Sequence, residues 1–371
     1  MDLPPFLLDH WLAKYAFASP PIKYDLASST GPKWTVGELL SLGTEASRLD
    51  DVTVSYAPAE GSSALREAIG AFLGVDPDWV VVTTGASEAL SILLCLAARP
   101  GGNVVLPSPA FPAFEAMANV WGLGARHYSL AREDNYRQSA RDVLAAANGE
   151  TVLALVNTPH NPTGTIMSPD EIAPLAAALA ERRVPLIVDE VYHPLYFDRE
   201  RPSAAAVENV LVMGDMSKAL SLAGLRMGWI VDANPERRKK LVDARSYFTI
   251  SGSPVLEALA IHALAHRDVL LARLQAVAEE NLAALSELME RVGDILGWVK
   301  PAGGTVAFPW FRDGRDSRPF CEALAARGVL VAPGDCFAMP DHMRVGFAVL
   351  KSGGFAEALT IFERTLREHS R

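Results

Sequence analysis

The residues with the clearest chemical potential are a lysine and an arginine that share one short segment. Lys218 follows Ser217, and Arg226 lies downstream within a Gly-x-Arg-x-Gly frame. Lysine is the side chain that forms Schiff bases with carbonyl groups. An arginine fork at a fixed distance could neutralise a phosphate. The segment therefore indicates capture of a carbonyl cofactor that carries a phosphate, although a surface lysine beside a glycine turn is the simpler interpretation of the lysine alone.

Two further groups follow apolar runs directly. Ala86 and Ser87 begin a helical pattern after a glycine turn, where free backbone N–H groups suit a phosphate. Asp189 ends another apolar run, and a buried acid is costly unless it is paired. Asp189 could hold a protonated ring nitrogen, and Tyr192, three residues on, could donate to a ring hydroxyl. The alternatives are an ordinary βα turn and an N-cap aspartate.

Three more residues are candidates for the same ligand. Phe111, between prolines, could stack on a planar ring or belong to the core. Asn161 lies in an Asn-x-Pro-x-Asn-Pro-Thr-Gly string that is more specific than a turn requires. Arg344 lies in an apolar run, and a buried arginine must be paired. It could clamp a carboxylate or form a structural salt bridge.

The elements that position these residues alternate between short apolar runs and helical patterns. The predicted strands are Val80–Thr84, Asn103–Leu106, Ala125–Ser129, Val152–Asn157, Pro185–Asp189, Val210–Gly214 and Gly228–Val231. Such runs suit strands that are covered on both faces. We therefore expect an α/β fold, with a large domain built on a mostly parallel seven-stranded sheet flanked by helices, plus a smaller α+β domain. Ligands bind outside the carboxyl ends of strands in such sheets, where the motifs fall.

The domain boundaries follow from the remaining pattern. We predict an N-terminal arm and part of the small domain over 1–45, the large cofactor-binding domain over 46–252, and an interdomain helix with the small domain over 253–371. One uninterrupted helix is expected over Ser253–Arg291, because no proline or glycine follows its start. A helix that long would link two domains.

Composition excludes several classes of function. The chain has 371 residues and a formal net charge of −10, with no basic arm, so nucleic acid is not expected as a partner. Three cysteines without a CxxC pair fit a reducing cytoplasm. The N-terminal residues lack a secretory pattern, and no apolar run is long enough to span a bilayer. We assign no metal site and no membrane partner.

Taken together, these motifs resemble those of fold-type I pyridoxal-phosphate enzymes, the class I/II aminotransferases of the aspartate aminotransferase superfamily. The resemblance rests on Asn157 to Gly164, on Asp189 with Tyr192, and on Ser217-Lys218 with Arg226, and it covers roughly residues 50–350. It implies a pyridoxal 5'-phosphate cofactor. It also implies transfer of an amino group between an amino acid and a 2-oxo acid.

The resemblance also implies individual roles. Lys218 would form the internal aldimine and move protons, Asp189 would pair the ring nitrogen, and Tyr192 and Asn161 would bond the phenolic oxygen. The other implied cofactor contacts are Ala86, Ser87 and Arg226 at the phosphate, Tyr56 reaching the phosphate of a neighbouring subunit, Phe111 on the ring, and Ser217. Arg344 and Gly31 would contact the substrate. The active enzyme would then be a homodimer with shared sites.

Two segments depart from the family pattern. Asp215 replaces the usual hydroxyl residue three before the lysine, and a carboxylate beside a phosphate is repulsive. We predict that it points away or bonds the Gly85–Glu88 turn. The N-terminal arm, Asp25 to Thr35, is similar to that of capreomycidine synthase-like enzymes, which process arginine-derived amino acids.

Other functions remain open from the sequence. Elimination, cyclisation or decarboxylation would use the same cofactor. A ligand-sensing domain of a regulator is a further alternative, which the acidic charge disfavours. No second, side-chain-directed arginine can be assigned, and Arg245, Arg48 and Lys33 are the candidates.

Overall fold

A seven-stranded sheet forms the centre of the protein. The computed structural model describes residues 5–43 and 49–369. The strands are β2 (Val80–Thr83), β3 (Asn103–Ser108), β4 (Gly124–Ser129), β5 (Thr151–Asn157), β6 (Leu186–Asp189), β7 (Val210–Asp215) and β8 (Gly228–Asp232). Their order is β2-β8-β7-β6-β5-β3-β4, and only β8 runs antiparallel to its neighbours. The predicted fold is confirmed, and each strand lies within two residues of its predicted bounds.

Apolar residues cover both faces of this sheet because successive strand residues point to opposite sides. In β5, Ala154 and Val156 join one core while Leu153 and Leu155 join the other. The first core packs under α3 (Ser63–Leu73), α6 (Ala140–Ala146), α7 (Pro169–Glu181) and α9 (Pro254–Ala265). The second packs under α4 (Gly85–Ala97), α5 (Ala113–Val120) and α8 (Pro235–Arg245). The continuous apolar runs in the sequence are explained by this double burial.

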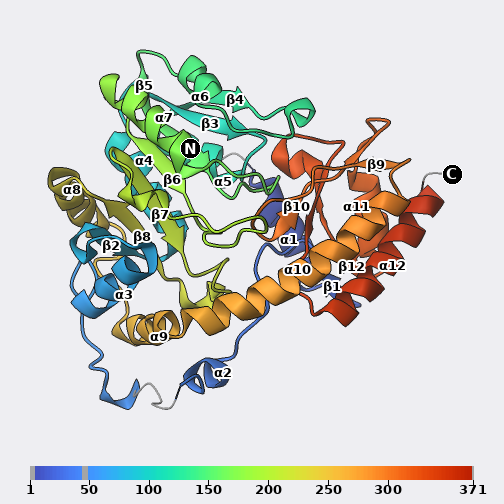
Figure 1. The fold of residues 1–371 in the computed structure, drawn as a ribbon, viewed down its shortest axis with the longest axis horizontal. Helices are drawn as coiled ribbons and strands as arrows, with labels where there is room; N and C mark the ends of the chain where they lie inside the picture. The colour runs from blue at the N-terminus through green and yellow to red at the C-terminus, as the bar shows by residue number, and fades with distance from the viewer. Residues whose placement is uncertain (1–4, 44–48, 370–371) are drawn as a thin grey trace.

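A separate core lies beside the sheet and joins the two ends of the chain (Figure 1). Its helices are α1 (Leu7–Ala16), α10 (Arg267–Arg291), α11 (Arg318–Ala325) and α12 (Ser352–His369). Its short strands are β1 (Tyr24–Asp25), β9 (Leu296–Gly297), β10 (Val306–Ala307), β11 (Trp310–Phe311), β12 (Val329–Leu330), β13 (Ala332–Pro333) and β14 (Met343–Gly346). Because β1 pairs in parallel with β12, the N-terminal arm is bound to this core. A short helix, α2 (Val36–Leu40), follows the arm.

The single helix predicted over Ser253–Arg291 is wrong. The helix is interrupted at His266, whose φ of −113° and ψ of 21° are not helical. This residue separates α9 from α10. The His266 ring donates a hydrogen bond from Nδ1 to the carbonyl of His262 at 2.9 Å, which stabilises the break. The break lets α9 pack on the sheet while α10 runs toward the separate core (Figure 1). No proline or glycine marks it, so the sequence pattern missed it.

The three-part domain division stays a prediction. Its first boundary, between 45 and 46, falls on residues outside those described. Across the described ranges, no helix is both long enough and apolar enough to cross a membrane.

Candidate active site

A cavity of about 190 Å³ lies where the carboxyl ends of β5, β6 and β7 meet. These ends are adjacent because Asn157 pairs with Asp189, and Asp189 with Met213. Nine predicted site residues line the cavity: Ala86, Ser87, Phe111, Asn161, Asp189, Tyr192, Ser217, Lys218 and Arg226. The sheet therefore brings together motifs that lie far apart in the sequence.

The antiparallel direction of β8 keeps the lysine segment at this end of the sheet. A parallel strand would need a crossover to the far edge, whereas Asp215 at the end of β7 pairs directly with Gly228 at the start of β8. The connection between them carries Ser217, Lys218 and Arg226. All three side chains consequently remain beside the cavity.

Lys218 is held in a largely desolvated position. Its Nζ donates to the Ser29 hydroxyl at 2.9 Å. Burial lowers the pKa of Lys218, while the carboxylate of Asp215 opposes that shift and the guanidinium of Arg344 adds to it. A lysine with a lowered pKa supplies more neutral amine near neutral pH, which is the nucleophilic and basic form.

Asp189 is a buried acid that also lines the cavity. Burial raises its pKa to about 7, although the Val191 N–H, which donates to its carboxylate at 3.1 Å, favours the charged form. Asn157 donates from its side chain to the Asp189 carbonyl at 3.1 Å and fixes that backbone. A cationic N–H partner in the cavity would compensate the buried carboxylate.

Tyr192 and Phe111 face the same space. The Tyr192 side chain is buried, and its hydroxyl has no hydrogen-bond partner among the described residues. Burial raises its pKa, so it stays a protonated donor. The Phe111 ring makes edge-on contacts with the rings of Phe6 and Phe114, whose centroids lie 5.9 and 5.7 Å from its own. An unpaired buried donor is costly, which points to a missing acceptor in the cavity.

Arg344 lies behind the cavity wall. Its guanidinium donates to Asn161 Oδ1 at 3.1 Å and to the Ala27 carbonyl at 2.7 Å, and its Nε is unpaired within the described chain. It is 2% exposed and forms no ion pair with a described carboxylate. The structure therefore does not support the alternative that Arg344 forms a structural salt bridge. A buried cation without a carboxylate partner would be stabilised by binding an anion.

The phosphate end of the cavity depends on two glycines. A Cβ on Gly85 would lie 2.5 Å from Arg226 Nη2, and a Cβ on Gly228 would lie 2.6 Å from the Gly85 backbone. Both positions must therefore be glycine for the first turn of α4, the start of β8 and the Arg226 guanidinium to meet. Ala86 and Ser87 then present N–H groups at a helix N-terminus beside a cation.

Asp215 takes one of its two predicted arrangements. Its Oδ2 accepts from the Ala86 N–H at 3.4 Å, which is the predicted bond to the Gly85–Glu88 turn. It also accepts from the Ser217 backbone at 2.9 Å and hydroxyl at 2.8 Å. Asp215 thus fixes the start of the lysine segment against the first turn of α4.

Besides Arg344, two other predicted residues do not line the cavity. Gly31 instead packs closely against Ser221 and Leu274. Tyr56 is 81% exposed and also lies outside the cavity. The sequence reasoning missed Ser29, which does line it. The Ser-Ser pair in the same arm was the available signal, and the choice of Gly31 placed the contact two residues too late.

The candidates for a second arginine give no assignment. Arg245 is fully buried and does not line the cavity. Lys33 is also absent from the wall, and Arg48 lies outside the described residues.

Comparison with known proteins decides the family. The model of aminotransferase class I and II matches residues 42–362. This chain belongs to the class I and II aminotransferase family. It is 34% identical over 356 residues to capreomycidine synthase from Streptomyces vinaceus, which covers 93% of this chain and 90% of that protein.

Solved structures agree with this membership. A pyridoxal-phosphate-dependent aminotransferase from Streptococcus suis superposes with a TM-score of 0.89 at 26% identity, covering 99% of both chains. The pyridoxal-phosphate-dependent cyclase OrfR gives a TM-score of 0.88 at 27% identity, covering 100% of this chain and 98% of that one. Pyridoxal phosphate is therefore the cofactor of this family member.

The residues of the cavity fit that cofactor. The unpaired Tyr192 hydroxyl offers a donor for a phenolic oxygen, and Asp189 offers a carboxylate for a ring nitrogen. Arg226 with the first turn of α4 suits a phosphate, and Lys218 supplies the amine. The Asp215 carboxylate is the one feature that opposes a phosphate, and its charge is stabilised by hydrogen bonds from Ala86 and Ser217.

Proposed function

We propose that the protein is a pyridoxal-phosphate-dependent aminotransferase that moves an amino group between an α-amino acid and a 2-oxo acid. The observation that carries the proposal is the position of Lys218, on one cavity wall with Asp189 and Tyr192 and near the unpaired cation of Arg344. Family membership supports the amino acid and the oxo acid as substrates.

Each residue has a distinct task in this proposal. When bound, pyridoxal phosphate supplies a carbonyl that condenses with amines and a ring that withdraws electrons from the substrate Cα. Arg344 would bind the substrate carboxylate and orient the Cα–H bond toward Lys218 Nζ. Lys218, with its lowered pKa, would take that proton and return it. Asp189 would keep a proton on the ring nitrogen, and Tyr192 would donate to the phenolic oxygen.

A panel of amino acids tests the reaction. Purified, cofactor-loaded protein is given each amino acid with and without 2-oxoglutarate or pyruvate. Products are identified by mass spectrometry while the visible absorbance of the cofactor is followed. An aminotransferase converts the donor to its 2-oxo acid and aminates the added acceptor in equal amounts. Turnover that continues without any acceptor would contradict transamination.

Cyclisation is a second candidate because the match to capreomycidine synthase spans 93% of this chain and a cyclase is among its structural neighbours. The same Cα proton transfer by Lys218 would then be followed by loss of a leaving group from the side chain and ring closure by a side-chain nitrogen. A β-hydroxylated amino acid with a side-chain guanidine is the matching probe. Its product would weigh one water less, and no oxo acid would be consumed.

A homodimer with shared sites is part of the proposal. Exposed apolar side chains support it: Val54, Tyr56, Tyr247 and Ile250 are 85%, 81%, 89% and 53% exposed. Arg226 is also exposed although it lies at the cavity. Tyr56 of one subunit would reach the phosphate site of the other.

Mixing two inactive variants tests this sharing. Lys218→Ala and Tyr56→Ala chains, unfolded and refolded together, would form hybrids with one complete site, so activity should rise above that of either variant. Activity that stays at the level of the separate variants in verified hybrids would show that Tyr56 acts within its own chain.

The cytoplasm is the compartment we propose. All three cysteines are free thiols in the structure, which suits a reducing environment. Fractionation of cells that make the tagged protein would test this location.

A further inference from the structure

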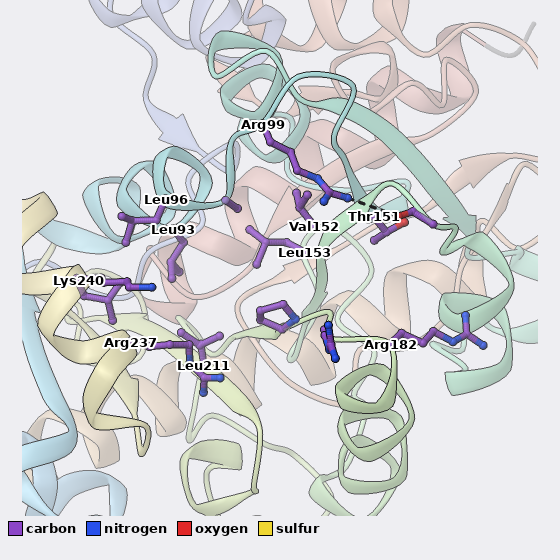
Figure 2. A pocket seen from close by; sticks show the side chains of 15 residues that line it. Leu93, Leu96, Arg99, Thr151, Val152, Leu153, Arg182, Leu211, Arg237 and Lys240 are labelled. Carbon is purple, nitrogen blue, oxygen red and sulfur yellow. Dashed lines mark hydrogen bonds between the residues drawn. The ribbon is translucent and has the colours of Figure 1, made fainter.

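A second hollow lies at the opposite end of the sheet (Figure 2). Its volume is about 480 Å³. Thr151 and Leu153 at the start of β5 line it, whereas Asn157 at the end of the same strand lines the active-site cavity. In the same way, Leu93 and Leu96 of α4 line the hollow while Ala86 lines the cavity. At 1.5 Å per residue, α4 separates the two places by roughly 10–15 Å.

The floor of the hollow is aliphatic. Side chains from α4, β5, β7 and α8 form it, and no aromatic residue is among the described residues of its lining. The main floor residues are Leu93, Leu96, Leu153, Leu211 and Leu241. A surface of this kind suits an alkyl chain and offers no ring for stacking a base.

The rim is cationic. Its charged residues are Arg99, Arg182, Arg183, Arg237 and Lys240, and the described lining contains no Asp or Glu. They come from three separate parts of the chain. Figure 2 shows Arg99, Arg237 and Lys240 around the leucine side chains, whereas Arg182 extends away from them. In a chain of net charge −10, such a cluster is a local reversal of sign.

Two carboxylates contact this rim from outside the lining. Asp232 accepts from Arg237 Nε and Nη2, both at 2.7 Å, which fixes the guanidinium. Glu150 lies 3.5 Å from Arg99 at an exposed position. Arg182 donates to the carbonyl of Leu144 at 3.0 Å.

The other two rim cations, Arg183 and Lys240, have no partner among the described residues. Neither Arg183 nor Lys240 makes a side-chain hydrogen bond or ion pair within the described chain. Five cations therefore meet two carboxylates, and positive charge remains in excess.

Helix capping accounts for only part of this rim. Arg99, Arg182 and Arg183 follow the C-terminal ends of α4 and α7, where cations are favoured by the helix dipole. Arg237 lies in the first turn of α8 and Lys240 in its middle, where the dipole gives no such reason. Because Asp232 holds Arg237, Lys240 is the rim cation for which neither the helix dipole nor a contact within the described chain gives a reason.

We propose that this hollow binds a small anion that carries a phosphate on an aliphatic body, such as an alkyl phosphate. The phosphate would lie between Arg183, Lys240 and the fixed guanidinium of Arg237, which is a fork suited to phosphate oxygens. The alkyl body would cover the leucine floor. The site is distinct from the cofactor cavity and shares only secondary-structure elements with it.

Calorimetric titration of the full-length, cofactor-loaded protein tests the site, because loading occupies the phosphate position of the other cavity. The probes are hexyl phosphate, butyl phosphate, inorganic phosphate and hexan-1-ol. Hexyl phosphate should bind with one-to-one stoichiometry. Each added methylene should tighten binding by about fourfold, the effect of burying one CH₂. Hexan-1-ol should bind at least tenfold more weakly.

Variants locate the binding. Arg183→Gln combined with Lys240→Gln should weaken hexyl phosphate by about tenfold or more and leave catalytic activity unchanged, because both side chains are exposed and far from Lys218. Arg364→Gln removes an exposed cation from α12 and is the matched control, with no expected effect. Leu96→Gln should weaken hexyl phosphate while leaving inorganic phosphate unchanged.

Two results would overturn the proposal. One is absence of saturable hexyl phosphate binding at millimolar concentration. The other is binding that the Arg183 and Lys240 substitutions leave intact. Neither result depends on whether the active site performs transamination or cyclisation.

Discussion

The polar groups at the two ends of β5 differ in their exposure to solvent. At the carboxyl end, Asp189, Tyr192 and Arg344 are buried, and the latter two keep unpaired atoms. At the amino end, Arg183 and Lys240 are exposed. Burial changes pKa values and makes each contact strong, whereas exposed charges act mainly through their sum and are screened by salt. The sheet thus separates a site that depends on individual atoms from one that depends on net charge.

The largest expected effect follows from removing the amine at the carboxyl end. Lys218→Ala should lower the turnover rate by about 10⁴-fold or more, because attachment of the cofactor and proton transfer depend on one Nζ. The visible absorbance of lysine-bound cofactor should disappear while the circular dichroism spectrum stays unchanged. Lys240→Ala removes a lysine at the amino end and should leave the rate as in the parent protein. A Lys218 variant with parental turnover would refute the assignment.

Burial of Asp189 predicts a pH-dependent stability. In the cofactor-free protein its pKa is about 7, raised from 3.8, so the folded state binds more protons than the unfolded state between these values. The stability that this group contributes therefore falls as pH rises from about 4 to 7. Asp189→Asn should raise the free energy of unfolding by a few kcal/mol more at pH 8 than at pH 5.

Thermal unfolding of cofactor-free protein at the two pH values measures this difference. Glu190, whose pKa burial also raises to about 7, is retained in both proteins, so its contribution cancels. A gain in melting temperature that is equal at pH 5 and pH 8 would show that Asp189 is not desolvated.

The sequence predicted the sheet well because most of its strands are apolar on both faces, and five of them lead into a motif with candidate site residues. The site was predicted through those motifs and the family resemblance. Ser29 was missed because its position depends on the arm crossing β14, where Gly346 N–H donates to Leu26 at 2.6 Å. The break at His266 was missed for the same kind of reason, since packing of α9 and α10 on different cores determines it.

Arg344 tests whether geometry matters as much as charge at the carboxyl end. Arg344→Lys keeps the charge but cannot donate to Asn161, Ala27 and a substrate carboxylate in the same plane. We expect the KM for the amino acid to rise by about 30-fold with a smaller change in kcat, as for loss of a binding contact. Arg364→Lys at the surface is the matched control. A KM within twofold of the parent value would place the carboxylate elsewhere.

Replacing Asp215 should have a smaller effect, and it should strengthen binding rather than weaken it. Asp215→Asn removes a negative charge beside the phosphate position. With its amide oxygen in the place of Oδ2, the asparagine can still accept from the Ala86 N–H and the Ser217 hydroxyl, and it loses the bond from the Ser217 N–H. The dissociation constant for pyridoxal phosphate should fall by about fivefold, because like charges no longer repel across a partly hydrated gap. Cofactor titration followed by absorbance measures it. Weaker cofactor binding would mean that the charge of Asp215 is required to hold the lysine segment.

The smallest expected effect is a difference in how salt changes ligand binding at the two ends of the sheet. Exposed charges interact across distances comparable to the Debye length, which is about 10 Å at 0.1 M salt and about 3 Å at 1 M. Hexyl phosphate binding at the amino end should therefore weaken by about threefold between those concentrations. The KM for the amino acid should change less, because Arg344 is 2% exposed and is little screened. Equal salt dependence at both ends would mean that the carboxylate site is open to solvent in the working enzyme, so that the burial separating the two ends would not persist during turnover.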